Sequence, residues 1–278
     1  MLVQVREQFL ESGFADVPGF KSDADIARLR ARAEDIVERF DPSEAISIFS
    51  TRDQAGKSDD YFLTSGDKIR CFFEEDAFDE RGQMRKPKAL SINKIGHAMH
   101  DLDPEFEGFS HGHRLAEIAS AVGIDDPGLY QSMYIFKQPD IGGEVNWHQD
   151  ATFFATEPVS VKAFWFALED ADRSNGCLWV EPGGHRSPLR QRFLVRDGHA
   201  DMEVLDGTPW PTMESAQPLE VERGTLVVFS GMLPHYSAPN RSPKSRHAYT
   251  LHAVSRRAKY AAENWLQRNA ALPPRGFV

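Results

Sequence analysis

A short aromatic stretch, NWHQDATFF at residues 146–154, contains two good metal ligands separated by one residue. His148 offers an imidazole nitrogen, and Asp150 offers a carboxylate oxygen. Side chains two positions apart in an extended segment point to the same face, so both can reach one ion. A third ligand, His235, follows the apolar run TLVVF further along the chain. Two histidines and one carboxylate that leave coordination positions open are the ligand set of non-haem Fe(II) oxygenases, so we expect an iron site.

Arg246 is a candidate for binding the co-substrate of such an iron site. Arg246 begins the strand-like run RHAYTLHA, shortly after His235. Its guanidinium could bind the far carboxylate of 2-oxoglutarate in a bidentate pair. Ser237, two residues after His235, could add a hydroxyl to the same carboxylate. These residues therefore predict Fe(II) as cofactor, 2-oxoglutarate as co-substrate and dioxygen as oxidant.

The segments that must position these side chains have the pattern of β-strands. After residue 125, short runs rich in aromatic and β-branched residues are separated by Gly, Pro and Asn turns. These runs include GLYQSMYIF, VKAFWFALED, GTLVVFSG and RHAYTLHAVS, and Asn175-Gly176 predicts a tight turn before CLWV. The pattern favours a mostly β protein, a sandwich or barrel, with helices packed outside it.

The first 125 residues have a more helical pattern. Residues 1–14 predict a short amphipathic helix, and residues 22–40 predict a longer one with Ser22 or Asp23 as its N-cap. Residues 93–122 predict helix interrupted by a loop at DPEFEGFSHGH, and STRDQAGKSDDYF predicts another loop. We therefore expect two or three helices before residue 125. We also expect one domain over residues 1–278, helical first and then β.

The composition excludes several classes of protein. A net charge of −10 over 278 residues argues against a nucleic-acid binder, which usually needs a basic face. No apolar run approaches the roughly 20 residues of a membrane span, and the first residues lack the apolar core of a signal peptide. Cys71 and Cys177 are far apart, which argues against a disulfide framework. We expect a cytoplasmic protein with a small-molecule substrate and neither a nucleic-acid nor a membrane partner. The sequence has no signal for an oligomeric state.

Several longer segments together resemble one family. The sequence is similar to the phytanoyl-CoA dioxygenase family of Fe(II)- and 2-oxoglutarate-dependent oxygenases. The matching segments begin near residue 60 and cover most of the chain from there: DYFLTSGDKIRCFFEE, SINKIGHAMH, QSMYIFKQP, GGEVNWHQDATF, NGCLWVEPGGH, SRHAYTLH and AENWLQ. The resemblance implies a double-stranded β-helix, or jelly-roll, core.

The resemblance also implies residues that spacing could not supply. Lys94, Met133 and Trp165 stand where the family contacts 2-oxoglutarate. The roles are chemically reasonable, because an ammonium can pair with a carboxylate while a thioether and an indole can form walls. Trp147 stands where close relatives often have a smaller residue, so it is expected to change the shape of the pocket.

The aromatic residues beside the metal ligands are predicted to form the substrate pocket. Trp147, Phe153 and Phe154 would exclude water and so protect the oxidant from side reactions. Asp150 bears on the reaction type, because related halogenases replace this carboxylate with a small residue to admit halide. Its presence favours hydroxylation with release of succinate and carbon dioxide.

Two other functions remain open at this stage. The chain could be a cupin-type metalloenzyme that does not use 2-oxoglutarate, or a jelly-roll metal-binding protein without turnover. The spacing of Arg246 from His235 speaks against the first. The substrate is not identified, and an acyl-CoA receives no support from the acidic net charge.

The remaining histidine pairs are more typical of packing or loops. His111 and His113 have the spacing of His148 and Asp150 but no strand pattern or third ligand. His97 and His100 lie three apart in a predicted helix and are expected to be packing or surface residues. His185, in the turn PGGHRS, could line the mouth of the pocket.

Overall fold

Two antiparallel sheets face each other in the computed structural model, which describes residues 1–43, 45–51 and 58–278. The larger sheet has seven strands, in the order β1 (Phe14–Val17), β12 (Leu226–Ser230), β7 (Lys162–Ala167), β14 (Ala248–Ser255), β4 (Pro127–Ile135), β3 (Ile92–His97) and β2 (Ile69–Phe73). The smaller sheet has four, in the order β11 (Gln217–Leu219), β8 (Leu178–Val180), β13 (His235–Ser237) and β5 (Val145–His148). This mostly β architecture confirms the predicted jelly-roll fold class.

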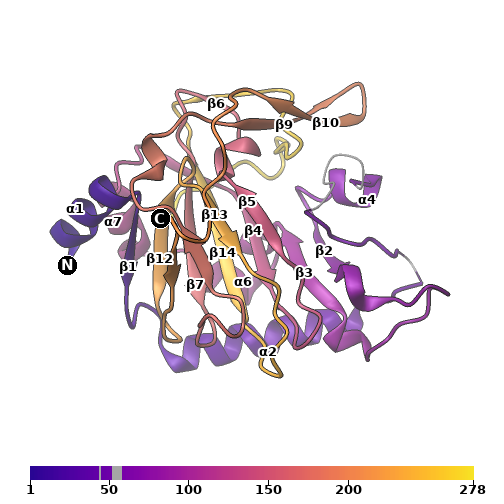
Figure 1. Cartoon of the computed structure of the whole chain (residues 1–278). Helices are drawn as coiled ribbons and strands as arrows, with labels where there is room; N and C mark the ends of the chain where they lie inside the picture. The colour runs from indigo at the N-terminus through magenta and orange to yellow at the C-terminus, as the bar shows by residue number, and fades with distance from the viewer. Residues whose placement is uncertain (44, 52–57) are drawn as a thin grey trace.

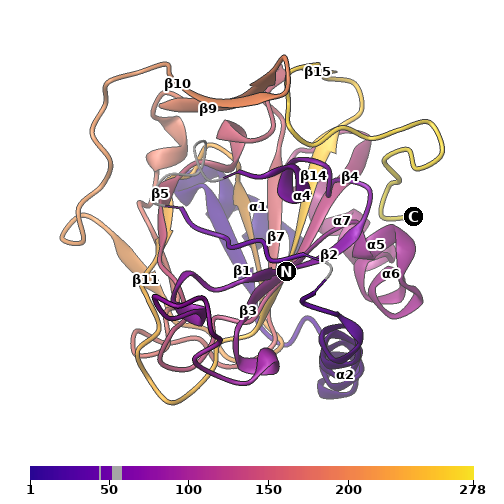
Figure 2. The same ribbon diagram turned by 90° about the vertical axis from the view of Figure 1, so that its right-hand side faces the viewer.

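Helices cover the outer face of the larger sheet, as Figures 1 and 2 show. They are α1 (Leu2–Ser12), α2 (Asp23–Arg39), α5 (Met99–Leu102), α6 (Pro104–Ser110) and α7 (His113–Ala121). The short α4 (Asp60–Leu63) packs elsewhere, because its Phe62 belongs to a separate cluster with Phe72, Phe193 and Trp265. In Figure 2, α5 and α6 lie on one side of the larger sheet, and β5 and β11 lie on the other. None of the helices in the described ranges combines the length and the apolar composition needed to cross a bilayer.

The described residues also contain two smaller pairs of strands and four single 3-10 turns. The strands β9 (Gln191–Arg196) and β10 (His199–Val204) form a ribbon over one end of the two sheets (Figure 1). The strands β6 (Thr156–Glu157) and β15 (Lys259–Tyr260) pair nearby. The turns are η1 (Glu75–Ala77), η2 (Lys88–Leu90), η3 (Asp150–Thr152) and η4 (Gly184–Arg186).

The alternation of side chains along the larger sheet separates two apolar cores. On β7, Phe164 and Phe166 pack toward the helices, whereas Ala163 and Trp165 face the space between the sheets. Because successive side chains of a strand point to opposite faces, the sequence of β7 directly determines which residues enter that interior space. The same rule places every second residue of β3, β4 and β14 inside it, and these strands lie side by side in the sheet.

The long helix α2 forms as the sequence predicts. Ser22 is its N-cap: the Ser22 hydroxyl accepts a hydrogen bond from the Asp25 backbone N–H, and the Asp25 carboxylate accepts one from the Ser22 N–H. Such a reciprocal capping box satisfies two donors that the first turn would otherwise leave open. Its apolar face buries Ile26 and Leu29 against the outer face of the larger sheet. The predicted N-terminal helix is also confirmed as α1, although it ends before Phe14.

The helix predicted over residues 93–122 is confirmed from Met99 onward as α5, α6 and α7, but its first part was wrong, because residues 92–97 are a strand. This strand, β3, lies between β2 and β4 and is buried on both faces. A strand buried on both faces lacks the polar and apolar alternation by which a half-exposed strand is recognised.

The loops predicted in the first half were also partly wrong. The segment DPEFEGFSHGH contains α6, whose N-cap Asp103 accepts hydrogen bonds from the N–H groups of Glu105 and Phe106. The segment STRDQAGKSDDYF ends within α4, and its residues 52–57 lie outside the described residues. The first 125 residues therefore contain more than two or three helices, together with three strands of the larger sheet.

Candidate metal centre

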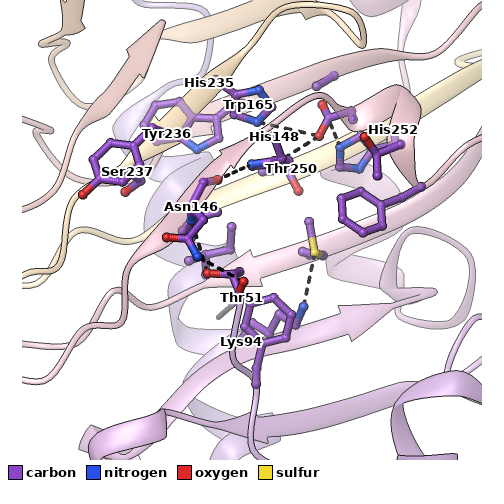
Figure 3. Close-up of a pocket in the computed structure, with 18 of the residues that line it drawn as sticks. Thr51, Lys94, Asn146, His148, Trp165, His235, Tyr236, Ser237, Thr250 and His252 are labelled. Carbon is purple, nitrogen blue, oxygen red and sulfur yellow. Dashed lines mark hydrogen bonds and ion pairs between the residues drawn. The ribbon is translucent and has the colours of Figure 1, made fainter. Parts of the chain in front are cut away.

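Three predicted ligands come together between the two sheets (Figure 3). His148 ends β5, Asp150 begins η3, and His235 begins β13. Because β5 and β13 are hydrogen-bonded neighbours with His235 directly opposite His148, the two imidazoles lie side by side, with ring centroids 4.0 Å apart. The ligand atoms of all three residues lie within 4.8 Å of one another. They are the only such group of three or more among the described residues.

The Asp150 carboxylate presents one oxygen to both histidines. Its Oδ1 lies 3.6 Å from Nε2 of His148 and 3.7 Å from Nε2 of His235. These separations are longer than direct hydrogen bonds and suit three donors that surround a common ion. Imidazole and carboxylate ligands together fit a divalent transition metal such as iron.

Backbone carbonyls orient both imidazoles. Nδ1 of His148 donates to the Asn146 carbonyl at 2.8 Å, and Nδ1 of His235 donates to the Leu233 carbonyl at 3.0 Å. A proton held on Nδ1 leaves the Nε2 lone pair free to bind a metal, which is the usual supporting arrangement of metal-bound histidine. Both histidines are therefore in the tautomer that coordination requires.

The local electrostatics favour the metal-binding protonation states. Burial, together with the neighbouring His148, lowers the pKa of His235 to about 4. Burial alone would raise the pKa of Asp150, but the neighbouring side chains of His252, His235 and His148 hold that pKa well below its usual value. At neutral pH His235 is consequently an unprotonated imidazole and Asp150 a carboxylate, the states in which they ligate metals.

The residue between the first two ligands anchors their turn. Gln149 is fully buried and points away from the site. Its amide donates to the carbonyls of Pro188 and Met232 and accepts from the Arg190 N–H. With Gln149 held in this way, the backbone can turn directly after it into η3 and bring Asp150 beside His148.

A buried arginine lies in the same space and has no acidic partner among the residues that the structure describes. Arg246 is 1% exposed, and its guanidinium donates to the Gly176 carbonyl at 3.1 Å and to the Ser237 hydroxyl at 3.3 Å. Its remaining terminal nitrogen, Nη1, has no hydrogen-bond partner among the described residues. Burial lowers the pKa of Arg246 to about 10, so the group still carries its charge at neutral pH. A buried, incompletely paired cation is costly unless an anion binds beside it.

The ligands and Arg246 line one cavity of about 380 Å³, within the range typical of small-molecule sites. Lys94, Met133 and Trp165, from β3, β4 and β7, also line it. The Lys94 ammonium lies 3.9 Å from Sδ of Met133 and 3.3 Å from the ring centroid of Phe49, and no ion pair joins it to a carboxylate in the described part of the chain.

The predicted aromatic walls are present at this cavity as well. Trp147, Phe153 and Phe154 all line it. Trp147 stacks on Tyr236 with ring centroids 5.5 Å apart, and Phe153 meets the His148 ring edge-on at 6.1 Å. The indole of Trp147 is thus held at the wall, next to the metal ligands, where it narrows the cavity.

Sequence reasoning missed other residues of this cavity. Thr250 and His252 of β14 face inward, and Nε2 of His252 lies 3.3 Å from Oδ2 of Asp150. Their spacing of two in RHAYTLHA was a usable signal, because strand residues two apart share a face with each other and with Arg246. Phe49 and Trp265 come from irregular segments, for which no periodic pattern exists.

The other histidines lie outside the cavity. His97 and His100 are fully buried and bond to Ser65 and Ser132, so of the two roles expected for them they have the packing one. His185 does not line the cavity. It packs against Gly13 at the end of α1 instead.

Comparisons with known proteins agree with this fold and site. The phytanoyl-CoA dioxygenase (PhyH) family matches over residues 9–248. The chain is 44% identical to the phytanoyl-CoA dioxygenase of Arabidopsis thaliana, over 97% of this chain and 94% of that protein. It is 42% identical to phytanoyl-CoA dioxygenase domain-containing protein 1 of Bos taurus, over 96% and 95%.

Solved structures with low sequence identity share the fold. The non-heme alpha-ketoglutarate-dependent carbocyclase SnoK from nogalamycin biosynthesis superposes with a TM-score of 0.65 at 17% identity, covering 97% of this chain and 94% of SnoK. EvdO2 of Micromonospora carbonacea, in complex with 2-oxoglutarate, superposes with a TM-score of 0.57 at 23% identity. The match covers 95% of this chain and 96% of EvdO2. The extent and identity of the sequence matches place this chain in the phytanoyl-CoA dioxygenase (PhyH) family.

Proposed function

We propose that the protein is an Fe(II)- and 2-oxoglutarate-dependent dioxygenase that hydroxylates a small molecule. One observation supports this most strongly: a His-Asp-His ligand set and a buried arginine without an acidic partner line the same cavity. The first needs a cation, and the second needs an anion. A divalent iron together with a dicarboxylate co-substrate satisfies both needs at once.

His148, Asp150 and His235 would hold the iron through Nε2, Oδ1 and Nε2. Bound iron and 2-oxoglutarate supply the activation of dioxygen, with release of succinate and carbon dioxide. The protein contributes orientation of the reactants and exclusion of water.

Arg246 and Ser237 would hold the far carboxylate of 2-oxoglutarate. The unpartnered Nη1 of Arg246 is available for a charge-assisted hydrogen bond, and the Ser237 hydroxyl lies beside the guanidinium. Lys94, Met133 and Trp165 would complete this part of the cavity. Burial lowers the pKa of Lys94 well below its usual value, so the bound carboxylate would be the group that favours its charged form. The thioether and indole would form the walls of this part of the cavity.

The substrate would bind against Trp147, Phe153 and Phe154, where the cavity is aromatic. Aromatic walls exclude water from the reacting carbon and favour an apolar or flat substrate surface. Replacement of Trp147 with alanine is expected to change the KM for the substrate and leave substrate-independent succinate formation nearly unchanged. Asp150, as a third ligand, favours hydroxylation over halide transfer.

A metal-binding jelly roll without turnover and a cupin-type metalloenzyme are the competing functions. Succinate formation separates the proposed function from both of them, because neither would convert 2-oxoglutarate. The Fe(II)-loaded protein, incubated in air with 2-oxoglutarate, should form succinate, and a panel of metabolites should reveal the substrate by stimulating this rate. The matched control is Asp150→Ala. Absence of succinate above that control, with and without every metabolite, would contradict the proposal.

A further inference from the structure

We propose that His252 is a positioning residue that directs Asp150 to bind the metal through one oxygen only. This inference rests on the metal site of the proposed function. His252 lies on β14, in the larger sheet, whereas the histidine ligands come from β5 and β13 of the smaller sheet. The carboxylate of Asp150 therefore lies between the two sheets, with a histidine from the larger one on its far side (Figure 3).

The two oxygens of Asp150 have different surroundings. Oδ1 faces Nε2 of both His148 and His235, at 3.6 and 3.7 Å. Oδ2 faces Nε2 of His252 at 3.3 Å, which is within ion-pair distance, and no hydrogen bond from the described residues reaches it. One oxygen is therefore left for the ion, and the other has a single protein partner.

The tautomer of His252 follows from its surroundings. Its Nδ1 is buried and has no partner among the described residues. If the proton were on Nδ1, that N–H would be a buried donor without an acceptor. The lone pair of Nε2 would then face a carboxylate oxygen, and the two would repel each other. A proton on Nε2 instead lies on the side of the ring that is 3.3 Å from Oδ2, where it is attracted to the carboxylate. The second arrangement is favoured, and it places the N–H of His252 beside Asp150.

Packing fixes the ring in this orientation. The His252 ring stacks on Phe154, with ring centroids 4.9 Å apart and an angle of 24° between the planes. His252 is 6% exposed and Phe154 is 2% exposed, so both rings are confined. A rigid donor on Oδ2 disfavours rotation of the carboxylate toward bidentate binding. Monodentate binding by Asp150 keeps one more coordination position open for reactants.

Anaerobic titration with Co(II) tests this role without co-substrate or turnover. The probe gives two readouts: the dissociation constant, and the visible absorption that reports the coordination number of the ion. Three variants are compared with the wild type. His252→Leu removes the donor, and His252→Gln keeps an amide donor. His100→Leu is the matched control, because His100 also lies buried beside a buried aspartate, with Nε2 3.1 Å from Oδ2 of Asp101, outside the cavity.

We expect His252→Leu to weaken Co(II) binding roughly 10- to 100-fold, the usual effect of removing a partner of a metal ligand, and to shift the visible spectrum toward a higher coordination number. His252→Gln should restore most of the affinity, and His100→Leu should bind as the wild type does. Wild-type affinity and spectrum in His252→Leu would overturn the inference. An equal loss in His100→Leu would also overturn it, because the effect would then be one of general stability.

If His252→Leu does not fold, Phe154→Leu decides the question, because it removes the stacking partner and keeps the histidine. A smaller loss of affinity with the same spectral shift is expected, and no change would contradict the inference. A wild type that binds Co(II) but forms no succinate with iron would contradict the proposed function alone. A wild type that binds no Co(II) would contradict both.

Discussion

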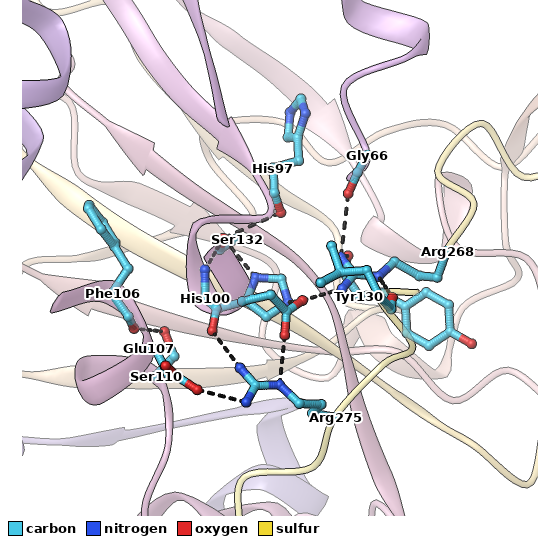
Figure 4. Close-up of polar contacts among 12 residues, drawn as sticks. Gly66, His97, His100, Phe106, Glu107, Ser110, Tyr130, Ser132, Arg268 and Arg275 are labelled. Atoms are coloured by element: carbon cyan, nitrogen blue, oxygen red, sulfur yellow. Dashed lines mark hydrogen bonds and ion pairs between the residues drawn. The ribbon is translucent and has the colours of Figure 1, made fainter. Parts of the chain in front are cut away.

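Asp101 and Asp150 are both buried beside histidines, yet only one of them has protein cations for partners. Asp101, with a side chain that is 1% exposed, forms ion pairs with Arg268 and Arg275 and lies 3.1 Å from Nε2 of His100. Arg268 and Arg275 reach this cluster from the C-terminal segment (Figure 4). Asp150, 7% exposed, contacts only histidine side chains, and no lysine or arginine pairs with it among the described residues.

The difference identifies which carboxylate is built to bind an external cation. The charge of Asp101 is compensated within the chain, so that cluster joins α5 to the C-terminal segment and needs nothing more. At neutral pH His235 is a neutral imidazole, and a buried carboxylate without a compensating cation is costly. A metal ion would supply the charge that the protein does not.

Replacement of Asp150 with alanine should have the largest effect. It removes a ligand and the only carboxylate of the three-residue group, so metal affinity should fall by more than the roughly 100-fold caused by loss of a supporting residue. Anaerobic titration with Fe(II) or Co(II) measures this loss. If Asp150→Ala bound metal within a few-fold of the wild-type affinity, Asp150 would not be a metal ligand, and the contrast with Asp101 would be wrong.

Replacement of Asp101 with asparagine should lower the free energy of unfolding by about 3–5 kcal/mol, because it leaves buried cations uncompensated. Metal affinity should not change. Denaturant unfolding and metal titration of the same preparation measure the two quantities. A variant with normal stability and weakened metal binding would reverse the roles assigned to the two aspartates.

Acid should distinguish the wild type from this variant. Burial alone would raise the pKa of Asp101, but His100, Arg268 and Arg275 hold it well below the usual value near 3.9. A lowered folded-state pKa contributes stability above the unfolded-state value, and that contribution disappears as the pH falls below about 4. The loss of stability below pH 4 should therefore be shallower in Asp101→Asn than in the wild type, as unfolding curves at several pH values would reveal.

Replacement of Arg246 with methionine should weaken 2-oxoglutarate binding and leave metal binding intact. Loss of one partner of a buried charge pair costs about 2–5 kcal/mol of binding free energy. The lower value corresponds to a dissociation constant for 2-oxoglutarate that is about 30-fold higher. Calorimetry on the Mn(II)-loaded protein, which does not turn over, measures it. An unchanged constant would show that the unpartnered guanidinium does not receive the carboxylate.

Replacement of Arg275 with alanine should have the smallest effect. Arg275 is 44% exposed at its side chain, and Arg268 remains on Asp101, so a loss of about 1 kcal/mol in unfolding free energy is expected. A loss as large as that of Asp101→Asn would show that the cluster depends on every member. Denaturant unfolding of the two variants under one condition gives the answer.

The sequence predicted the metal ligands because they depend on short-range spacing and strand alternation. His148 and Asp150 are local neighbours, and His235 follows an apolar run that could only be a strand. Lys94 was found through resemblance alone, since β3 is buried on both faces and its periodicity does not distinguish strand from helix.

His252 and the Asp101 cluster were not predicted, for a different physical reason. Each depends on which segments meet in space: β14 with η3 in one case, and α5 with the C-terminal segment in the other. Register between strands far apart in sequence, and the course of irregular segments, are set by tertiary packing rather than by local pattern. A buried polar residue on an inward-facing position was the one signal that could have identified His252.

The binding of iron and 2-oxoglutarate together at the His148, Asp150 and His235 site is the central claim. It is tested most directly by the visible spectrum of the anaerobic protein with Fe(II) and 2-oxoglutarate. A weak charge-transfer band should develop in the wild type and in Asp101→Asn, should be absent from His148→Ala and should require more 2-oxoglutarate in Arg246→Met. No band in the folded wild type at saturating Fe(II) and 2-oxoglutarate, or an equal band in His148→Ala, would contradict it.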